Sequence, residues 1–268
     1  MLARRRFSLF ALLATFSLTA CGEKSTRSED PPVIRIGMDL SYPPFEMLDR
    51  SGSPDGVSVR IAEALANHLG CELKIVPMDF SGLIPALQTG NIDLVLSSMT
   101  ATEERRGSID FSDPYAFTGL ALLVSTKSDI QSIKDLHRPG RILTAKTATT
   151  GQSWITRHLP DAKLVVFEDP SACVMEVAQG RADAFIYDQL SIHHHAQENP
   201  DTTRAILAPF VEESWAIGIA KGNDTLRSQV NDFIARFREK KGFELLGDRY
   251  LKEEKSFLEK QGVPFILR

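Results

Sequence analysis

The 268-residue sequence has few of the features that mark nucleic-acid-binding, membrane-spanning or disulfide-rich proteins. Its formal net charge is −4 and its basic residues form no stripe with interleaved aromatics, so no nucleic-acid partner is expected. Beyond residue 32, no apolar stretch reaches the roughly 20 residues that a membrane-spanning helix needs. With 43% hydrophobic and 25% charged residues, the composition is that of a globular protein with one large domain or two medium ones.

Motifs for metal binding and nucleophilic catalysis are also missing. His193–His195 are consecutive, and neighbouring side chains on a helix point about 100° apart, so they cannot converge on one ion. The stretch TTGQSW lacks the Gly-x-Ser-x-Gly spacing of a nucleophile elbow, and no catalytic triad is evident. We therefore expect no metal, no cofactor and no catalytic residues.

The first 20 residues are typical of a secretion signal. Arg4, Arg5 and Arg6 precede a short apolar core, and the core ends in small residues before Cys21. The stretch LTAC resembles a bacterial lipobox, which implies cleavage before Cys21 and lipidation of its thiol, including palmitate. The alternative is an ordinary signal peptide with an incidental cysteine. We expect a signal peptide over 1–20 and a lipidated, flexible tether over 21–32, with the lipid as the only membrane contact.

Strand-like and helix-like segments alternate along the rest of the chain. Residues 33–38 alternate as a strand does, whereas 57–70 carry apolar side chains at helical spacing and end at a glycine. The segment 224–242 predicts a strongly amphipathic helix. Such alternation argues for an α/β protein with mostly parallel sheets.

Two segments repeat one pattern, in which a helix end is followed by glycine, aspartate and an apolar strand: ALQTGNIDLVLSS and EVAQGRADAFIYD. Ser98 and Asp188 each lie eight residues after the glycine of their segment. Both therefore end equivalent strands, where open α/β sheets place their ligands. The repeat suggests two similar lobes that offer polar groups to a shared cleft.

Five stretches together resemble one known family, and the resemblance covers Val33 to Tyr250. They span residues 34–46, 78–115, 147–154, 180–189 and 216–231. The family is the bacterial extracellular solute-binding proteins, family 3, which contains the polar amino-acid-binding proteins of ABC importers.

This resemblance implies the type II periplasmic-binding-protein fold, an α/β fold of two lobes joined by two hinge strands. Lobe 1 would comprise 33–121 and 214–268, with a C-terminal tail, and lobe 2 would comprise 122–213. The hinge crossings are expected near Gly119–Val124 and Phe210–Ala216.

The same division separates the two remaining cysteines, Cys71 and Cys173. They could pair in an oxidising compartment. However, a bond between lobes would restrain opening, so two separate buried thiols are favoured.

A free amino acid carries a carboxylate and an ammonium, and each needs a partner when it is buried. For the carboxylate, Arg105 offers a planar fork, with Ser98 and Thr100 as hydroxyl and backbone donors, and the family resemblance implies the same role for Arg105. Alternatively, Arg106 makes the contact. For the ammonium, Asp188 is the expected counter-ion, although it can also cap the following helix.

Further ligand contacts follow from the resemblance. Thr149 and Thr150 match a turn of the family, but Ala148 stands where the family has glycine, which puts the geometry of the turn in doubt. Tyr42 and Phe80 match positions whose aromatic rings sandwich the ligand.

Recognition of the ligand's side chain depends on Asp39 and Lys146. If both point into the cleft, an amide side chain would satisfy the acceptor and the donor together. If Lys146 points to solvent, a basic ligand is favoured. The sequence thus predicts a polar amino acid without deciding which one.

The predicted function is the substrate-binding component of an ABC importer, which captures a polar L-amino acid by hinge closure and delivers it to a membrane permease. It would act as a monomer in the periplasm or at the outer face of the cell membrane. Two alternatives remain: a periplasmic enzyme on the same scaffold, similar to cyclohexadienyl or arogenate dehydratases, and an amino-acid sensor subunit.

Overall fold

The computed structural model describes residues 31–260 and 264–268. The expected signal peptide, Cys21 and most of the expected tether lie outside the described residues. Among the helices that are described, none is both long enough and apolar enough to cross a membrane.

An eight-stranded sheet, in the order β4-β1-β5-β10-β6-β9-β7-β8, runs through the described part of the chain. The pairs β1·β4, β1·β5, β7·β8 and β7·β9 are parallel, whereas the pairs that involve β6 or β10 are antiparallel. The expectation of mostly parallel sheets therefore holds for the two flanks and is wrong for the centre. The strands are β1 (Val33–Met38), β4 (Glu72–Pro77), β5 (Leu94–Val95), β6 (Asp110–Ser125), β7 (Ile142–Lys146), β8 (Lys163–Phe167), β9 (Ala184–Asp188) and β10 (Thr203–Ile219), and a small separate pair is formed by β2 (Met47–Leu48) and β3 (Pro54–Asp55).

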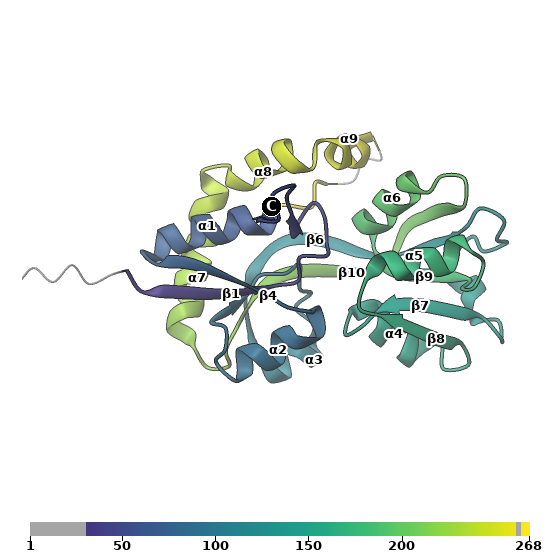
Figure 1. Cartoon of the computed structure of the whole chain (residues 1–268), viewed down its shortest axis with the longest axis horizontal. Helices are drawn as coiled ribbons and strands as arrows, with labels where there is room; N and C mark the ends of the chain where they lie inside the picture. The colour runs from purple at the N-terminus through teal and green to yellow at the C-terminus, as the bar shows by residue number, and fades with distance from the viewer. Residues whose placement is uncertain (1–30, 261–263) are drawn as a thin grey trace, which may run out of the picture. The chain divides into compact units, whose positions relative to one another are not determined.

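The two central strands, β6 and β10, join the two flanks of the sheet (Figure 1). They pair along the whole of β6, with register shifts between Ile206 and Val211 and on both sides of Ala216. Both expected hinge crossings fall inside these strands, while the lobe boundaries themselves stay a prediction.

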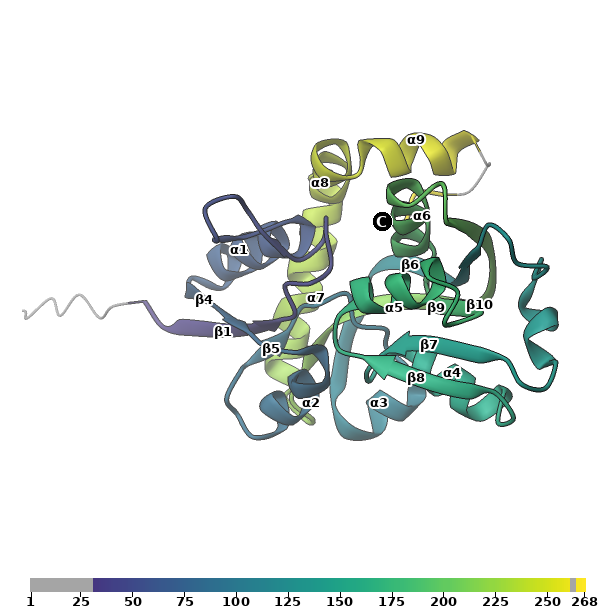
Figure 2. The same cartoon turned by 45° about the vertical axis from the view of Figure 1, so that its right-hand side comes forward.

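Helices cover both flanks, as Figures 1 and 2 show. We call the part around β4, β1 and β5 the first lobe and the part around β9, β7 and β8 the second lobe. The first lobe carries α1 (Val57–Leu69), α2 (Phe80–Gln88), α3 (Glu103–Ser108), α7 (Asp224–Glu239), α8 (Gly242–Tyr250) and α9 (Lys252–Lys260), and the second carries a 3-10 turn (Ile133–His137), α4 (Thr150–His158), α5 (Pro170–Ala178) and α6 (Gln189–Glu198).

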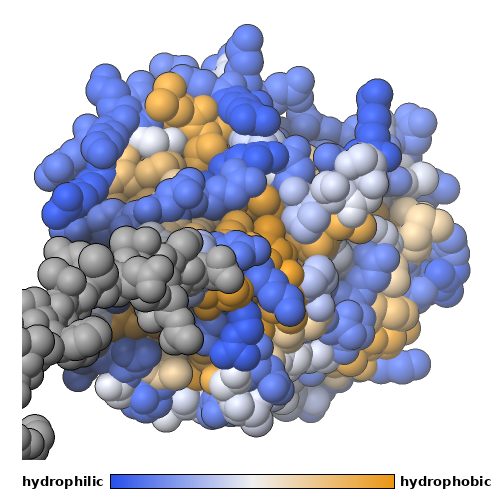
Figure 3. All heavy atoms as spheres, turned by 60° about the vertical axis from the view of Figure 1, so that its left-hand side comes forward, coloured by the Kyte–Doolittle hydropathy of each residue, from blue (hydrophilic) through white to orange (hydrophobic). Residues whose placement is uncertain are grey.

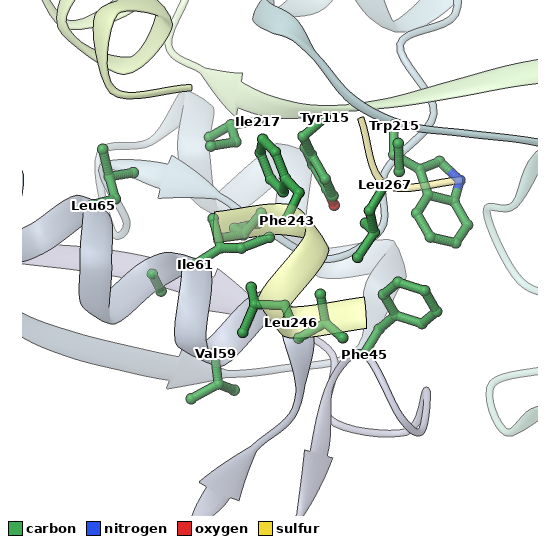
Figure 4. Packing of buried hydrophobic residues seen from close by; sticks show 14 of the residues in the cluster. Phe45, Val59, Ile61, Leu65, Tyr115, Trp215, Ile217, Phe243, Leu246 and Leu267 are labelled. Atoms are coloured by element: carbon green, nitrogen blue, oxygen red, sulfur yellow. The ribbon is translucent and has the colours of Figure 1, made fainter. Parts of the chain in front are cut away.

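The first lobe has a core in which α1 faces side chains from the sheet and from α8 (Figure 4). Ile61 and Leu65 of α1 are fully buried there, as their helical spacing predicts. Helix α7 ends at Glu239 rather than at residue 242, because Lys241 adopts a left-handed φ of 60° and starts a new helix. A Cβ at Gly242 would stand 2.5 Å from the Phe237 ring, so a larger residue there would displace that ring.

The surface in Figure 3 is mainly hydrophilic, with separate hydrophobic patches between the polar side chains. The two cysteines of the described residues are free: Cys71 is half-buried and Cys173 is buried. The two thiols are separate, as expected, and Cys173 is buried, but the expectation that Cys71 is also buried is wrong. Burial raises the pKa of the Cys173 thiol to about 11.

Candidate ligand-binding site

A small cavity lies between the lobes, at the carboxyl ends of the flanking strands. All ten predicted site residues line it, and they are Asp39, Tyr42, Phe80, Ser98, Thr100, Arg105, Lys146, Thr149, Thr150 and Asp188. The structure therefore brings together side chains that are up to about 150 residues apart in the sequence.

Arg105 is held by backbone carbonyls rather than by acids. Its Nη1 donates to the carbonyl of Thr100 and its Nη2 to the carbonyl of Ala148, each at 2.9 Å, and its guanidinium lies 5.3 Å from the centre of the Phe80 ring. Burial lowers the pKa of Arg105. No carboxylate of the described residues lies within ion-pair distance of it, so its charge is left for the cavity.

Arg106, the alternative contact, does not line the cavity. It pairs with Glu103 at 3.6 Å and lies over the ring of Phe111. Its side chain is 42% exposed.

The hydroxyls of Ser98 and Thr100 are engaged by buried acids. Ser98 Oγ donates to the two carboxyl oxygens of Glu46 at 2.9 and 3.1 Å, and Thr100 Oγ1 donates to Glu213 Oε2 at 3.1 Å. Burial raises the pKa of Glu46 to about 8 and also raises the pKa of Glu213. In this arrangement neither hydroxyl is directed to a ligand carboxylate.

Asp188 caps helix α6, which is the second role that the sequence predicted for it. Its Oδ1 accepts from the N–H groups of Leu190 and Ser191 at 3.0 and 3.1 Å. The cap uses one carboxylate oxygen, and the nearby Tyr42 hydroxyl also favours the ionised form of the carboxyl group. Burial raises the pKa of Asp188 to about 6.

Asp39 and Lys146 form an ion pair across the cavity, with 2.9 Å between Oδ2 and Nζ. Lys146 is 2% exposed and also donates to Ser41 Oγ and to the carbonyl of Glu168. Asp39 accepts further bonds from Ser41 and from the N–H of Phe80. The alternative in which Lys146 points to solvent is therefore wrong.

The turn before α4 keeps a conformation that favours glycine although the sequence has alanine. Ala148 has a φ of 59°, in the left-handed region, and its N–H donates to Gln152 Oε1 at 2.6 Å. Thr149 caps α4, and its hydroxyl donates to the carbonyl of Lys146 at 2.6 Å. Thr150 then begins helix α4 beside the cavity. The turn over Ala148–Thr150 therefore forms although alanine stands where the family has glycine.

Tyr42 lies against a group of aromatic side chains. Its ring makes edge contacts with Tyr187 and Trp215, with ring centres 5.9 and 5.8 Å apart. The Tyr42 hydroxyl is buried without a hydrogen-bond partner among the described residues. Phe80 lines the cavity from the start of α2.

Comparison with known families identifies the chain. Residues 34–253 match the bacterial extracellular solute-binding proteins, family 3. The chain belongs to this family. Members are described as extracellular, which supports a location outside the cytoplasm.

Two curated relatives of this solute-binding protein bind different amino acids. It is 32% identical to the arginine-binding extracellular protein ArtP of Bacillus subtilis (strain 168) over 253 residues, which cover 92% of this chain and 97% of ArtP. It is 35% identical to the glutamine-binding protein of Geobacillus stearothermophilus over 241 residues, which cover 80% of this chain and 90% of that protein.

Among solved structures, the solute-binding protein is similar to the ancestral amino acid-binding protein AncCDT-1, a precursor of cyclohexadienyl dehydratase. The two share 33% identity with a TM-score of 0.75, and the match covers 81% of this chain and 94% of AncCDT-1. The fold expected from the sequence, the type II periplasmic-binding-protein fold, is thereby confirmed.

Five further residues of the solute-binding protein line the cavity and were missed by the sequence prediction: Glu46, Ser97, Tyr187, Glu213 and Trp215. Two of them had a usable signal, since Ser97 and Tyr187 directly precede the predicted Ser98 and Asp188. Glu213 and Trp215 come from β10, in which nothing distinguishes residues that face the cavity.

Proposed function

We propose that the protein is the substrate-binding component of an ABC importer and holds a polar L-amino acid in this cavity. The observation that carries the proposal is that the cavity holds both a buried cation, Arg105, and a buried acid, Asp188, and that neither forms an ion pair among the described residues. The carboxylate and the ammonium of an amino acid would each gain a charged partner. A ligand with only one of these groups would leave the other side of the cavity unpaired.

We assign the ligand's side chain to the end of the cavity at Asp39 and Lys146. A primary amide can donate to Asp39 and accept from Lys146. A cationic side chain would meet Asp39 as well, but it would also face the like charge of Lys146. The buried ion pair therefore favours an amide side chain over that of arginine or lysine.

Hinge motion at β6 and β10 would give the ligand access. The carboxylate would bind first at Arg105 on the first lobe, between Tyr42 and Phe80. The second lobe would then close and bring Asp188 and the Thr149–Thr150 turn onto the ammonium. The ligand stabilises the closed arrangement only as far as it binds that arrangement more tightly.

The loaded protein would dock on a membrane permease as a monomer. The leader sequence supports lipid anchoring through Cys21, in the periplasm or at the outer face of the cell membrane. Under this proposal the protein converts no substrate.

Calorimetry with the twenty standard amino acids tests the proposal. We expect at least one polar amino acid to bind with a Kd of about 1 μM or below, which is about −8 kcal/mol. Arg105→Ala should abolish most of that affinity. Absence of binding by all twenty would refute the importer function, and unchanged affinity in Arg105→Ala would refute the carboxylate assignment.

An enzymatic function is the second candidate, because AncCDT-1 is described as a precursor of a dehydratase. Prephenate and arogenate are the substrates to assay, with release of water and carbon dioxide followed by product absorbance. Turnover of either compound would favour the enzyme, whereas tight amino-acid binding without turnover would favour the importer component.

A further inference from the structure

Glu46 is a fully buried acid beneath the cavity, and the proposed ligand contacts do not use it. Its exposed fraction is 0%, and two backbone hydrogen bonds with Tyr42, at 2.9 and 2.8 Å, fix its position. No lysine, arginine or histidine of the described residues pairs with it. Burying a carboxyl group without a cationic partner costs free energy, so some other interaction must account for Glu46 at this position.

The carboxyl group of Glu46 receives the hydroxyl of Ser98, at 2.9 Å to one oxygen and 3.1 Å to the other. Ser98 is one of three non-glycine residues of the described chain with a positive φ, and its φ is 46°. A side chain in this left-handed region strains the backbone, and a local hydrogen bond can compensate for the strain. Glu46 supplies the acceptor for that bond.

The turn at Ser98 leads directly to the proposed carboxylate anchor. Two residues later, the carbonyl of Thr100 accepts from Arg105 Nη1 at 2.9 Å. One residue earlier, Ser97 Oγ accepts from the N–H of Asp39 at 2.9 Å. The conformation of Ser98 therefore sets the relative placement of Arg105 and Asp39.

The groups around Glu46 favour its neutral form. Burial raises its pKa to about 8, and the carboxylates of Asp39 and Asp188 act in the same direction, while the hydroxyls of Ser58 and Ser98 oppose it. Tyr115, from β6, has a buried hydroxyl and also lies near Glu46. At neutral pH the floor of the cavity thus adds no negative charge where a ligand carboxylate would enter.

We propose that Glu46 is a positioning residue for the ligand carboxylate: it holds Ser98 in its left-handed turn, and the turn places the carbonyl that orients Arg105. The inference rests on the proposed amino-acid binding, and it assigns Glu46 to the part shared by all amino acids. Loss of the acceptor should therefore weaken every ligand by the same factor.

Calorimetry on Glu46→Met, Glu46→Gln and Ser98→Ala tests the inference. Glu46→Met, which lacks an acceptor, and Ser98→Ala, which lacks the donor, should each weaken binding about tenfold without changing the ranking of ligands. Glu46→Gln keeps an acceptor and should lose less. Above pH 8 the wild-type protein should lose affinity as Glu46 ionises, and Glu46→Gln should not.

A double-mutant cycle separates positioning from a general structural role. In a Ser98→Gly background the backbone needs no support, because glycine adopts a positive φ freely. The loss of ligand affinity caused by Glu46→Met should therefore be at least about fivefold smaller in that background than in the wild type. Glu63→Gln, which changes a half-buried acid of α1 paired with Arg60, is the matched control and should bind as the wild type does.

The outcomes distinguish this inference from the proposed function. If the wild-type protein binds and both Glu46→Met and Ser98→Ala bind equally well, the positioning role is overturned. It is also overturned if Glu46→Met changes the ranking of ligands. If Glu46→Met does not fold, the affinities of Glu46→Gln and Ser98→Ala still decide. If the wild-type protein binds no amino acid, the proposed function fails instead.

Discussion

Removing the charge of Lys146 should shift ligand preference from amide toward cationic side chains. In Lys146→Met the stem keeps its length and packing, but Asp39 loses the ammonium that lies 2.9 Å from its Oδ2. A lysine or arginine ligand could then supply the missing cation, and the like charge that opposes such ligands would be gone.

The magnitude follows from the burial of the pair, whose side chains are 3% and 10% exposed. Breaking a buried ion pair costs about 3–5 kcal/mol. Asp39 keeps its hydrogen bonds from Ser41 and Phe80, so the loss should lie near the lower value. If a cationic ligand recovers about half of 3 kcal/mol, the ratio of affinities for arginine and glutamine rises about tenfold.

Calorimetry at pH 7 with glutamine, arginine and lysine measures this ratio in the wild type and in Lys146→Met. The control is Lys221→Met, which removes an ion pair with Asp110. The Lys221 side chain is 57% exposed, and neither residue lines the cavity. If the ratio in Lys146→Met stays within about twofold of the wild-type ratio, the ligand's side chain does not reach Asp39 and the assignment is refuted.

Three other substitutions or conditions have expected outcomes. Ala148→Gly should raise the Tm by about 1–3 °C in a thermal melt, because glycine relieves the strain of a φ of 59°. Ligand affinity should fall about tenfold per pH unit below about pH 6, because the Asp188 carboxyl group, with a pKa of about 6, then takes up a proton that the ligand ammonium must displace. Calorimetry at pH 4.5–7 measures this dependence, and a flat profile would show that Asp188 is not the counter-ion. His193 stacks on Phe257 with ring centres 4.0 Å apart, and burial lowers the pKa of His193, so its protonation below about pH 6.5 favours the unfolded chain. His193→Phe should keep the stacking, and its Tm should fall less between pH 7 and pH 5 than that of the wild type.

The sequence predicted best where a local pattern fixes a position in space. An apolar strand that ends in polar residues delivers them to one edge of the sheet, and Ser98 and Asp188 lie there as expected. The partner of a hydroxyl is not local in this sense. Ser98 donates to Glu46, which is 52 residues away, so the sequence could supply the donor but not name its acceptor.

The central strands were harder to predict for a related reason. Glu213 reaches the cavity because β10 pairs with β6 in antiparallel register, Glu213 opposite Thr118. That register depends on a shift between Ile206 and Val211, which no short sequence pattern signals. Parallel flanks follow from strand–helix alternation, whereas an antiparallel centre arises from two long strands that return between the lobes.

Charge balance links the site to a class of ligand more firmly than any one contact does. Asp39 and Lys146 neutralise each other, and Glu46, with a pKa of about 8, is neutral at pH 7. Arg105 and Asp188 then remain without an ion pair among the described residues, and Glu213, whose pKa burial raises, lies near Arg105 without pairing with it. A zwitterion with an uncharged side chain completes both pairs and adds no net charge, whereas a cationic side chain would leave one buried charge in excess, which is expensive. Glu46 and the Asp39–Lys146 ion pair therefore favour the same ligand that Arg105 and Asp188 select.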